Sequence, residues 1–297
     1  MEELGTTQLS PIETSLVYRD GCNWTTDRAQ TLDELSLSIV TMVICLFGLV
    51  GNGIILCFLG CHIKRNPFTI YILNLAVTDF GFLLILFAIL IIHITSNEAC
   101  FDLLYLFIKE TFILVSFYPY TTSLCLLTAI SVERCLSVLF PIWYRTRRSK
   151  HLSCYVCTLL WIFSTLLNAV KFFNSHIFIW IISLILNVII IPCILVVSNL
   201  ILFIRLQCGS QRHQPGRLYI VILLTVLFFL LFAVPFNFFI FVHFNNMVYG
   251  NIFLILASVN SSINPVIYFL VGSYRKRKLR VSVKVALQRV FEDKVEK

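Results

Sequence analysis

The sequence predicts an all-α membrane protein, a bundle of seven transmembrane helices followed by a short amphipathic eighth helix. Hydrophobic residues make up 59% of the 297 residues, charged residues make up 13%, and the mean hydropathy is +0.90. The apolar residues stand in long uncharged runs, and a run of about 20 residues crosses the hydrocarbon core as a helix. Short basic clusters separate the runs. Basic clusters in this arrangement are typical of a protein whose loops lie at the inner membrane surface, and not of a nucleic-acid-binding protein.

The apolar runs define the elements in chain order. We expect spans at residues 35–61, 68–95, 103–138, 152–171, 177–204, 217–243 and 249–272. Residues 1–34 then form an extracellular segment, residues 35–272 the seven-helix domain, and residues 273–297 a cytoplasmic amphipathic helix with a short tail. In this last segment Leu279, Val283, Leu287 and Phe291 recur every four residues opposite a basic face. Such a helix lies in the interface of an anionic leaflet, and a disordered basic tail is the alternative.

Lysine and arginine predict the orientation in the plasma membrane. They cluster after the first, third, fifth and seventh spans, whereas the other side holds only Arg19, Arg28, Lys109 and Lys171. The positive-inside rule therefore places the C-terminus in the cytoplasm and the N-terminus outside. The glycosylation sequon at Asn23 agrees with this orientation.

The cysteines do not indicate a structural metal site. Most of them fall inside apolar runs, where they act as small buried hydrophobes, and no spacing typical of zinc is present. Only Cys22 and Cys100 lie in predicted outside segments. A Cys22–Cys100 disulfide fits this placement, but spacing alone does not establish whether the two are bonded.

Polar residues inside the spans form a recognisable series. Asp79 is the one acidic residue in the middle of a span, where it serves either as structural glue between helices or as a cation or proton site. The series continues with Asn52, Glu133-Arg134-Cys135, Trp161, Pro192, Pro235 and Asn264-Pro265-Val-Ile-Tyr268. This set, in this order, resembles the rhodopsin-like G-protein-coupled receptors.

A narrower resemblance covers nearly all of residues 35–291. The stretch from Ala129 to Tyr144, Leu218-Tyr219, and the stretch from Phe269 to Ser273 look like the Mas-related receptor family. The resemblance implies a sensory or nociceptive receptor that activates a heterotrimeric G-protein of the Gq or Gi class. It also implies a G-protein activation switch made of Glu133, Arg134, Asn264, Pro265 and Tyr268.

The switch residues have a physical reading beside the resemblance. We expect Arg134 to pair with Glu133 at rest and to be freed for the G-protein on activation; a snorkelling arginine without a switching role is the alternative. The resemblance further implies an allosteric sodium pocket at Asp79, Ser123, Asn260 and Asn264. A carboxylate with neutral oxygen ligands suits this hard cation. We expect no other cofactor.

The outer half departs from the usual pattern. Lys109 stands where rhodopsin-like receptors usually bear a disulfide cysteine, and the connection between the fourth and fifth spans, residues 172–176, is very short. Ser116 replaces the aspartate of amine receptors, so the ligand is expected to be a peptide or another small molecule and not a monoamine. Candidate ligand-binding residues are Lys109, Glu110, Ser116, Tyr120, Lys171, Trp180, Phe236, Phe239 and Tyr249. For the aromatic ones, lipid contact is an equal alternative.

The functional hypothesis is a receptor and not an enzyme, because the sequence holds no catalytic constellation. Two rivals remain. The short outer connection and the missing disulfide cysteine at position 109 favour a receptor fold that no longer signals alone, such as a decoy or a partner subunit. A transporter or channel is the remote rival, since one mid-membrane aspartate and no internal repeat give it little support.

Overall fold

A computed structural model describes residues 27–61, 66–96, 103–149, 151–173, 177–208, 220–221, 223–228, 231–232 and 247–273, with 285, 287 and 290. In this part of the chain, six helices are long and apolar enough to cross a membrane. They correspond to the predicted first to fifth and seventh spans. The predicted all-α membrane class is therefore confirmed, while most of the sixth span lies outside the described residues.

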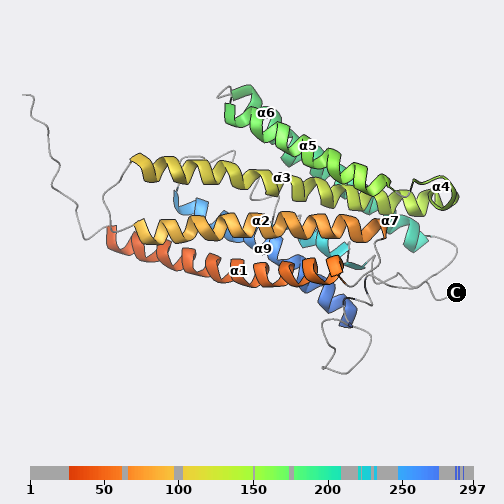
Figure 1. The fold of residues 1–297 in the computed structure, drawn as a ribbon, viewed down its shortest axis with the longest axis horizontal. Coiled ribbons are helices and arrows are strands. Elements are labelled where there is room, and N and C mark those ends of the chain that lie inside the picture. Colours follow the sequence, from red (N-terminus) through yellow and green to blue (C-terminus); the bar gives the residue numbers. More distant parts are fainter. Residues whose placement is uncertain are drawn as a thin grey trace, which may run out of the picture.

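The helices pack as an elongated bundle (Figure 1). α1 (Asp27–Cys61) contacts α2 (Pro67–Ser96) and α9 (Met247–Ser273), and α3 (Leu103–Leu139) contacts α2, α5 (Leu152–Phe173) and α7 (Ile191–Cys208). α4 (Pro141–Thr146) is a single short helix after α3. α3 therefore lies between the two halves of the described bundle.

α2 begins with a side-chain cap formed by polar residues at its N-terminus. The Asn66 side chain accepts a hydrogen bond from the Thr69 backbone N–H at 2.8 Å, and the Thr69 hydroxyl accepts one from the Asn66 N–H at 2.9 Å. This reciprocal cap satisfies amides that a helix start leaves open, and Pro67 stands at the first helical position, where it loses no bond.

The predicted fifth span is one path made of three segments. α6 (Ile177–Leu184) continues through a π-helical stretch, η1 (Ile185–Ile190), into α7. Pro192 is the second residue after the π-helical stretch and lacks the N–H that a regular helix would need there. Residues 174–176 alone separate α5 from α6, in line with the very short connection expected between these spans.

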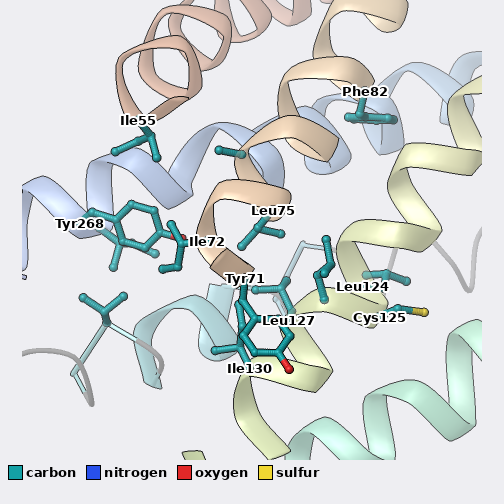
Figure 2. Packing of buried hydrophobic residues seen from close by; sticks show 14 of the residues in the cluster. Ile55, Tyr71, Ile72, Leu75, Phe82, Leu124, Cys125, Leu127, Ile130 and Tyr268 are labelled. Carbon is teal, nitrogen blue, oxygen red and sulfur yellow. The ribbon is translucent and has the colours of Figure 1, made fainter. Parts of the chain in front are cut away.

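The core joins the inward faces of the helices (Figure 2). Ile55 of α1, Leu75 of α2, Leu124 and Leu127 of α3, and Tyr268 of α9 belong to one buried cluster. The outward faces carry exposed apolar side chains such as Phe47, Leu159 and Phe178, while Asn52, Thr78 and Asn264 are buried. Polar groups inside and apolar groups outside are the distribution that a lipid solvent selects.

The predicted amphipathic tail helix lies mostly outside the described residues. Val285, Leu287 and Val290 are helical, Leu287 and Val290 are buried in the core cluster, and Val285 is exposed. Leu287, which belongs to the predicted apolar face, therefore packs on the bundle.

Candidate functional site

Asp79 ties together the middle of the bundle. Its carboxylate is fully buried in α2. The Ser123 hydroxyl of α3 donates to Oδ1 at 2.9 Å, and the Asn264 Nδ2 of α9 donates to Oδ2 at 2.7 Å. One carboxylate thus joins three helices, because a buried charge needs donors and each neighbour supplies one.

The surroundings of Asp79 fit a small hard cation in their chemistry. The carboxylate, the Ser123 hydroxyl and the amide oxygens of Asn260 and Asn264 are suitable ligand groups, although the Asn264 amide presents its nitrogen to Asp79 in this structure. Asn260 is buried in α9, but no hydrogen bond between described residues joins it to Asp79. Ser261, which the sequence prediction did not include, is also buried in α9. Its position three residues before Asn264 places both on one face of α9.

Two further motif residues join helices by hydrogen bonds. The Asn52 Nδ2 of α1 donates to the Ser261 carbonyl of α9 at 3.1 Å and to the Gly48 carbonyl at 3.0 Å. The Trp161 Nε1 of α5 donates to the Asn74 Oδ1 of α2 at 3.0 Å. These bonds join α1 to α9 and α5 to α2, and α2 and α9 both contribute to the Asp79 cluster.

The expected pairing of Glu133 with Arg134 was wrong. Glu133 forms its ion pair with Arg148, and the Arg148 Nε donates to the Glu133 Oε1 at 2.6 Å. The hydroxyls of Tyr71 and Tyr144 also donate to this carboxylate, at 3.0 and 2.9 Å. Adjacent helical residues point about 100° apart, so Glu133 and Arg134 face different neighbours.

Arg134 packs on an aromatic ring of α2. Its guanidinium carbon lies 4.1 Å from the centroid of the Phe68 ring, and its Nε is buried without a hydrogen-bond partner among the described residues. Phe68 also lines a small cavity together with Ser131, Thr225 and Tyr268. Of the predicted switch residues, Arg134 thus packs on Phe68, and Tyr268 lines the same cavity as Phe68.

The rest of the predicted switch lies along α9. Asn264 belongs to the Asp79 cluster, Tyr268 is buried one turn further in, and Pro265 lies inside the helix between them. A proline removes one backbone hydrogen bond and weakens the helix at that point. α9 therefore runs from the Asp79 cluster to the cavity that Tyr268 lines, and the helical turn at Pro265 lies between these two points.

Tyr144 keeps its proton at the inner surface. Burial, and then the Glu133 carboxylate, raise the pKa of the Tyr144 hydroxyl. A tyrosine with a raised pKa remains neutral at physiological pH and can donate to a carboxylate. Tyr144 is thereby held as a hydrogen-bond donor to Glu133.

The predicted ligand-binding residues are described only in part. Tyr120 is buried in the core, with its ring 5.7 Å from that of Phe82, so the structure uses it to pack α3 on α2. The Lys171 ammonium of α5 is buried 5.6 Å from the centroid of the Phe117 ring of α3. The side chains of Lys109, Glu110, Ser116, Trp180 and Tyr249 lie outside the described part, as do Phe236, Phe239, Cys22, Cys100 and Asn23.

The sequence prediction missed Arg148, Tyr71 and Ser153 as site residues. The Arg148 Nη2 donates to the Ser153 hydroxyl at 2.5 Å, which connects the Glu133 cluster to the start of α5. In the sequence Arg148 is one of several basic residues after the third span, and nothing in that pattern selects it. Its partner depends on how the chain returns from α4.

Comparison with known proteins places this arrangement among membrane receptors. Residues 51–179 match the family model described as 7 transmembrane receptor (rhodopsin family). The chain is 37% identical to the Mas-related G-protein coupled receptor member D of Macaca fascicularis, over 88% of this chain and 87% of the relative. It is 39% identical to member H of Rattus norvegicus, over 99% and 95%. It is also 39% identical to member X1 of Homo sapiens, over 96% and 91%.

Proposed function

Because this chain belongs to the Mas-related family of rhodopsin-like G-protein-coupled receptors, we propose that it activates a heterotrimeric G-protein of the Gq or Gi class from the plasma membrane. The activating ligand is an extracellular peptide or small molecule. The family is a class of receptors and not of enzymes, and the chain is a multi-pass membrane protein. The N-terminus outside and the C-terminus in the cytoplasm complete the proposal.

The environment of Arg134 is the observation that carries the proposal. A buried guanidinium nitrogen without a partner among the described residues is unfavourable, so a conformation or a partner protein that supplies an acceptor gains free energy. Further along the chain, Phe140, just before α4, is 56% exposed, and Ile142 of α4 is 79% exposed. A G-protein could supply a hydrogen-bond acceptor to Arg134 and an apolar contact to α4. The surface formed by these residues therefore has the mixed polar and apolar character of a protein docking surface.

Signal transfer across the bundle follows the path of α9. Asn264 contacts Asp79 in the middle, and Tyr268 lines the inner cavity with Phe68, on which Arg134 rests. A ligand that binds more tightly to a conformation with a displaced inner α9 shifts the population toward that conformation. The turn at Pro265 is where such a displacement meets the least resistance.

The Asp79 cluster is the proposed site of an allosteric sodium ion. Asp79, Ser123 and Asn264 would hold the ion, and Asn260 of α9 would supply a further amide oxygen. When bound, the ion supplies positive charge that neutralises the buried carboxylate. The residues themselves link α2, α3 and α9, and this link favours the resting arrangement.

The ligand is proposed to carry an acidic or carbonyl group. Lys171 places a buried ammonium on the inner face of α5, and Lys109 is the second basic residue of the outer half. A cation in a low-dielectric site favours an anionic or strongly polar acceptor. The serine at 116, in the position of the amine-binding aspartate, disfavours monoamines.

The test compares G-protein activation in cells that express the intact chain, Arg134→Ala or Arg147→Ala at equal surface levels. Arg147 is exposed at the end of α4, so its side chain serves as a matched basic control. We expect Arg134→Ala to abolish the basal and ligand-panel signal and Arg147→Ala to retain it. Full signalling by Arg134→Ala would contradict the assigned role.

A second candidate is a receptor fold that no longer signals alone. The separation of α5 from α6 by residues 174–176 alone favours it, because little chain remains to cover an outer pocket. Normal surface expression with silence toward every class of G-protein would support this alternative.

A further inference from the structure

We propose that Arg148, and not Arg134, is the residue that holds Glu133 at rest, and that this pair fastens α4 until the G-protein binds. The inference rests on the proposed function and adds a regulatory contact to it. Arg148 is a positioning residue in this proposal, because it acts on the docking surface through the placement of α4.

The Glu133 carboxylate gathers donors from separate elements. Tyr71 comes from α2, Tyr144 from α4, and Arg148 from the connection between α4 and α5. The side chains of Arg148 and Glu133 are only 5% and 12% exposed. A charge pair shielded from water to this degree is a directed contact and not a mobile surface pair.

Arg148 is itself fixed from three sides. Its Nε and Nη2 meet Glu133, and its Nη2 also donates to the Ser153 hydroxyl of α5 at 2.5 Å. Its guanidinium carbon lies 5.0 Å from the centroid of the Tyr144 ring. A planar guanidinium satisfies these directions together, which a lysine ammonium cannot do.

α4 depends on these contacts for its position. The helix contains only residues Pro141–Thr146, too few for a helix to be stable by itself. Tyr144 within it and Arg148 just after it both bind the same carboxylate. Loss of the Arg148 pair therefore releases α4 at its C-terminal side and leaves Glu133 with the hydroxyl donors of Tyr71 and Tyr144.

Release of α4 changes the docking surface directly. Ile142 and Phe140 are exposed apolar side chains of this segment. Arg134, held on Phe68, directly follows Glu133 in α3. A partner that binds α4 and Arg134 together therefore competes with the Arg148–Glu133 pair, and the strength of the pair sets the basal activity.

The first measurement is basal G-protein activation at matched surface expression, without added ligand. The variants are Arg148→Ala, Arg148→Lys and the control Arg147→Ala. We expect a several-fold rise for Arg148→Ala, a smaller rise for Arg148→Lys, and no change for Arg147→Ala. The double variant Arg134→Ala, Arg148→Ala is expected to be silent, because the released surface still needs Arg134.

The second measurement does not depend on a G-protein. Amide hydrogen exchange over residues 141–149 of the purified full chain reports how often α4 opens. We expect exchange about tenfold faster in Arg148→Ala, the factor that corresponds to the loss of one charge-assisted hydrogen bond, and unchanged exchange in Arg147→Ala.

Together, the signalling and exchange measurements distinguish failure of the proposed contact, of its regulatory role and of the proposed receptor function. Unchanged exchange in Arg148→Ala overturns the proposed contact, whatever the signalling result. Faster exchange without a basal rise, in a chain whose signalling needs Arg134, overturns the regulatory role. Faster exchange with silence from every variant supports the contact and counts against the proposed function instead.

Discussion

At the scale of single residues, the fully buried carboxylate of Asp79 and the largely shielded carboxylate of Glu133 have different kinds of partner. Asp79 is bound by the neutral hydroxyl of Ser123 and the neutral amide of Asn264, whereas Glu133 is paired with the cationic Arg148. A buried carboxylate held by neutral donors favours a cation from solution, and a carboxylate with a fixed guanidinium has its charge already balanced. The sodium proposal therefore concerns Asp79 alone.

Asp79→Asn tests this difference. We expect sodium chloride to lower basal nucleotide exchange on the G-protein in membranes with the intact chain, relative to potassium chloride at equal ionic strength. The variant should lose this response, because an amide lacks the charge that binds the cation. Thr78→Val is the control, since the Thr78 hydroxyl donates to the Leu75 carbonyl of its own helix. A sodium response that persists in Asp79→Asn would exclude the pocket.

At the scale of helices, the crossing of α1 and α9 depends on a residue without a side chain. A Cβ atom at Gly48 would overlap Ser262 and lie 2.5 Å from Leu83 Cδ1. Ser262 is held by its bond to the Ile44 carbonyl at 3.2 Å, and Leu83 is fully buried. Small residues at a crossing let helix backbones approach closely enough for such bonds.

Gly48→Ala is therefore expected to destabilise the bundle by about 1–3 kcal/mol, the usual cost of overpacking. A Cβ atom at Gly60, in the same helix, would meet no atom of the described residues within 4 Å. Gly60→Ala should be neutral or slightly stabilising, because alanine favours helix. The midpoint of thermal unfolding in detergent measures both variants. Equal midpoints for the two would refute the crossing argument.

At the scale of the whole molecule, the basic clusters of the sequence follow helix ends that lie on one side of the bundle. The basic clusters of the sequence follow Cys61 of α1, Leu139 of α3, Cys208 of α7 and Ser273 of α9, and these helix ends lie toward the same end of the bundle (Figure 1). The positive-inside rule predicts that this end is cytoplasmic. We therefore expect the first helix to begin outside, on the side of the Asn23 sequon.

Glycosylation at Asn23 tests the orientation. We expect treatment with a peptide N-glycosidase to increase the gel mobility of the intact chain and to leave Asn23→Gln unchanged. Asn260 also lies in a sequon, but it is buried in α9 and should carry no glycan. Replacement of Asn260 should therefore leave the glycan in place. A glycan that persists in Asn23→Gln would count against this assignment.

The sequence by itself determined the membrane class, the spans and the helical character of the described part. These properties follow from the length and composition of each apolar run, because a span must satisfy its own backbone in lipid. The resemblance also indicated Ser123 and Asn264 near Asp79, which the structure brings together.

Only the tertiary structure decided which partners the charged and polar side chains take. Sequence adjacency suggested Arg134 for Glu133, but the fold brings Arg148 there from beyond α4. It also gives the Asp79 carboxylate hydrogen bonds from Ser123 and Asn264, while no bond between described residues joins Asn260 to that carboxylate. The physical reason is that a hydrogen bond depends on helix face and on the path of a connection. Neither is contained in the local composition that identifies a span.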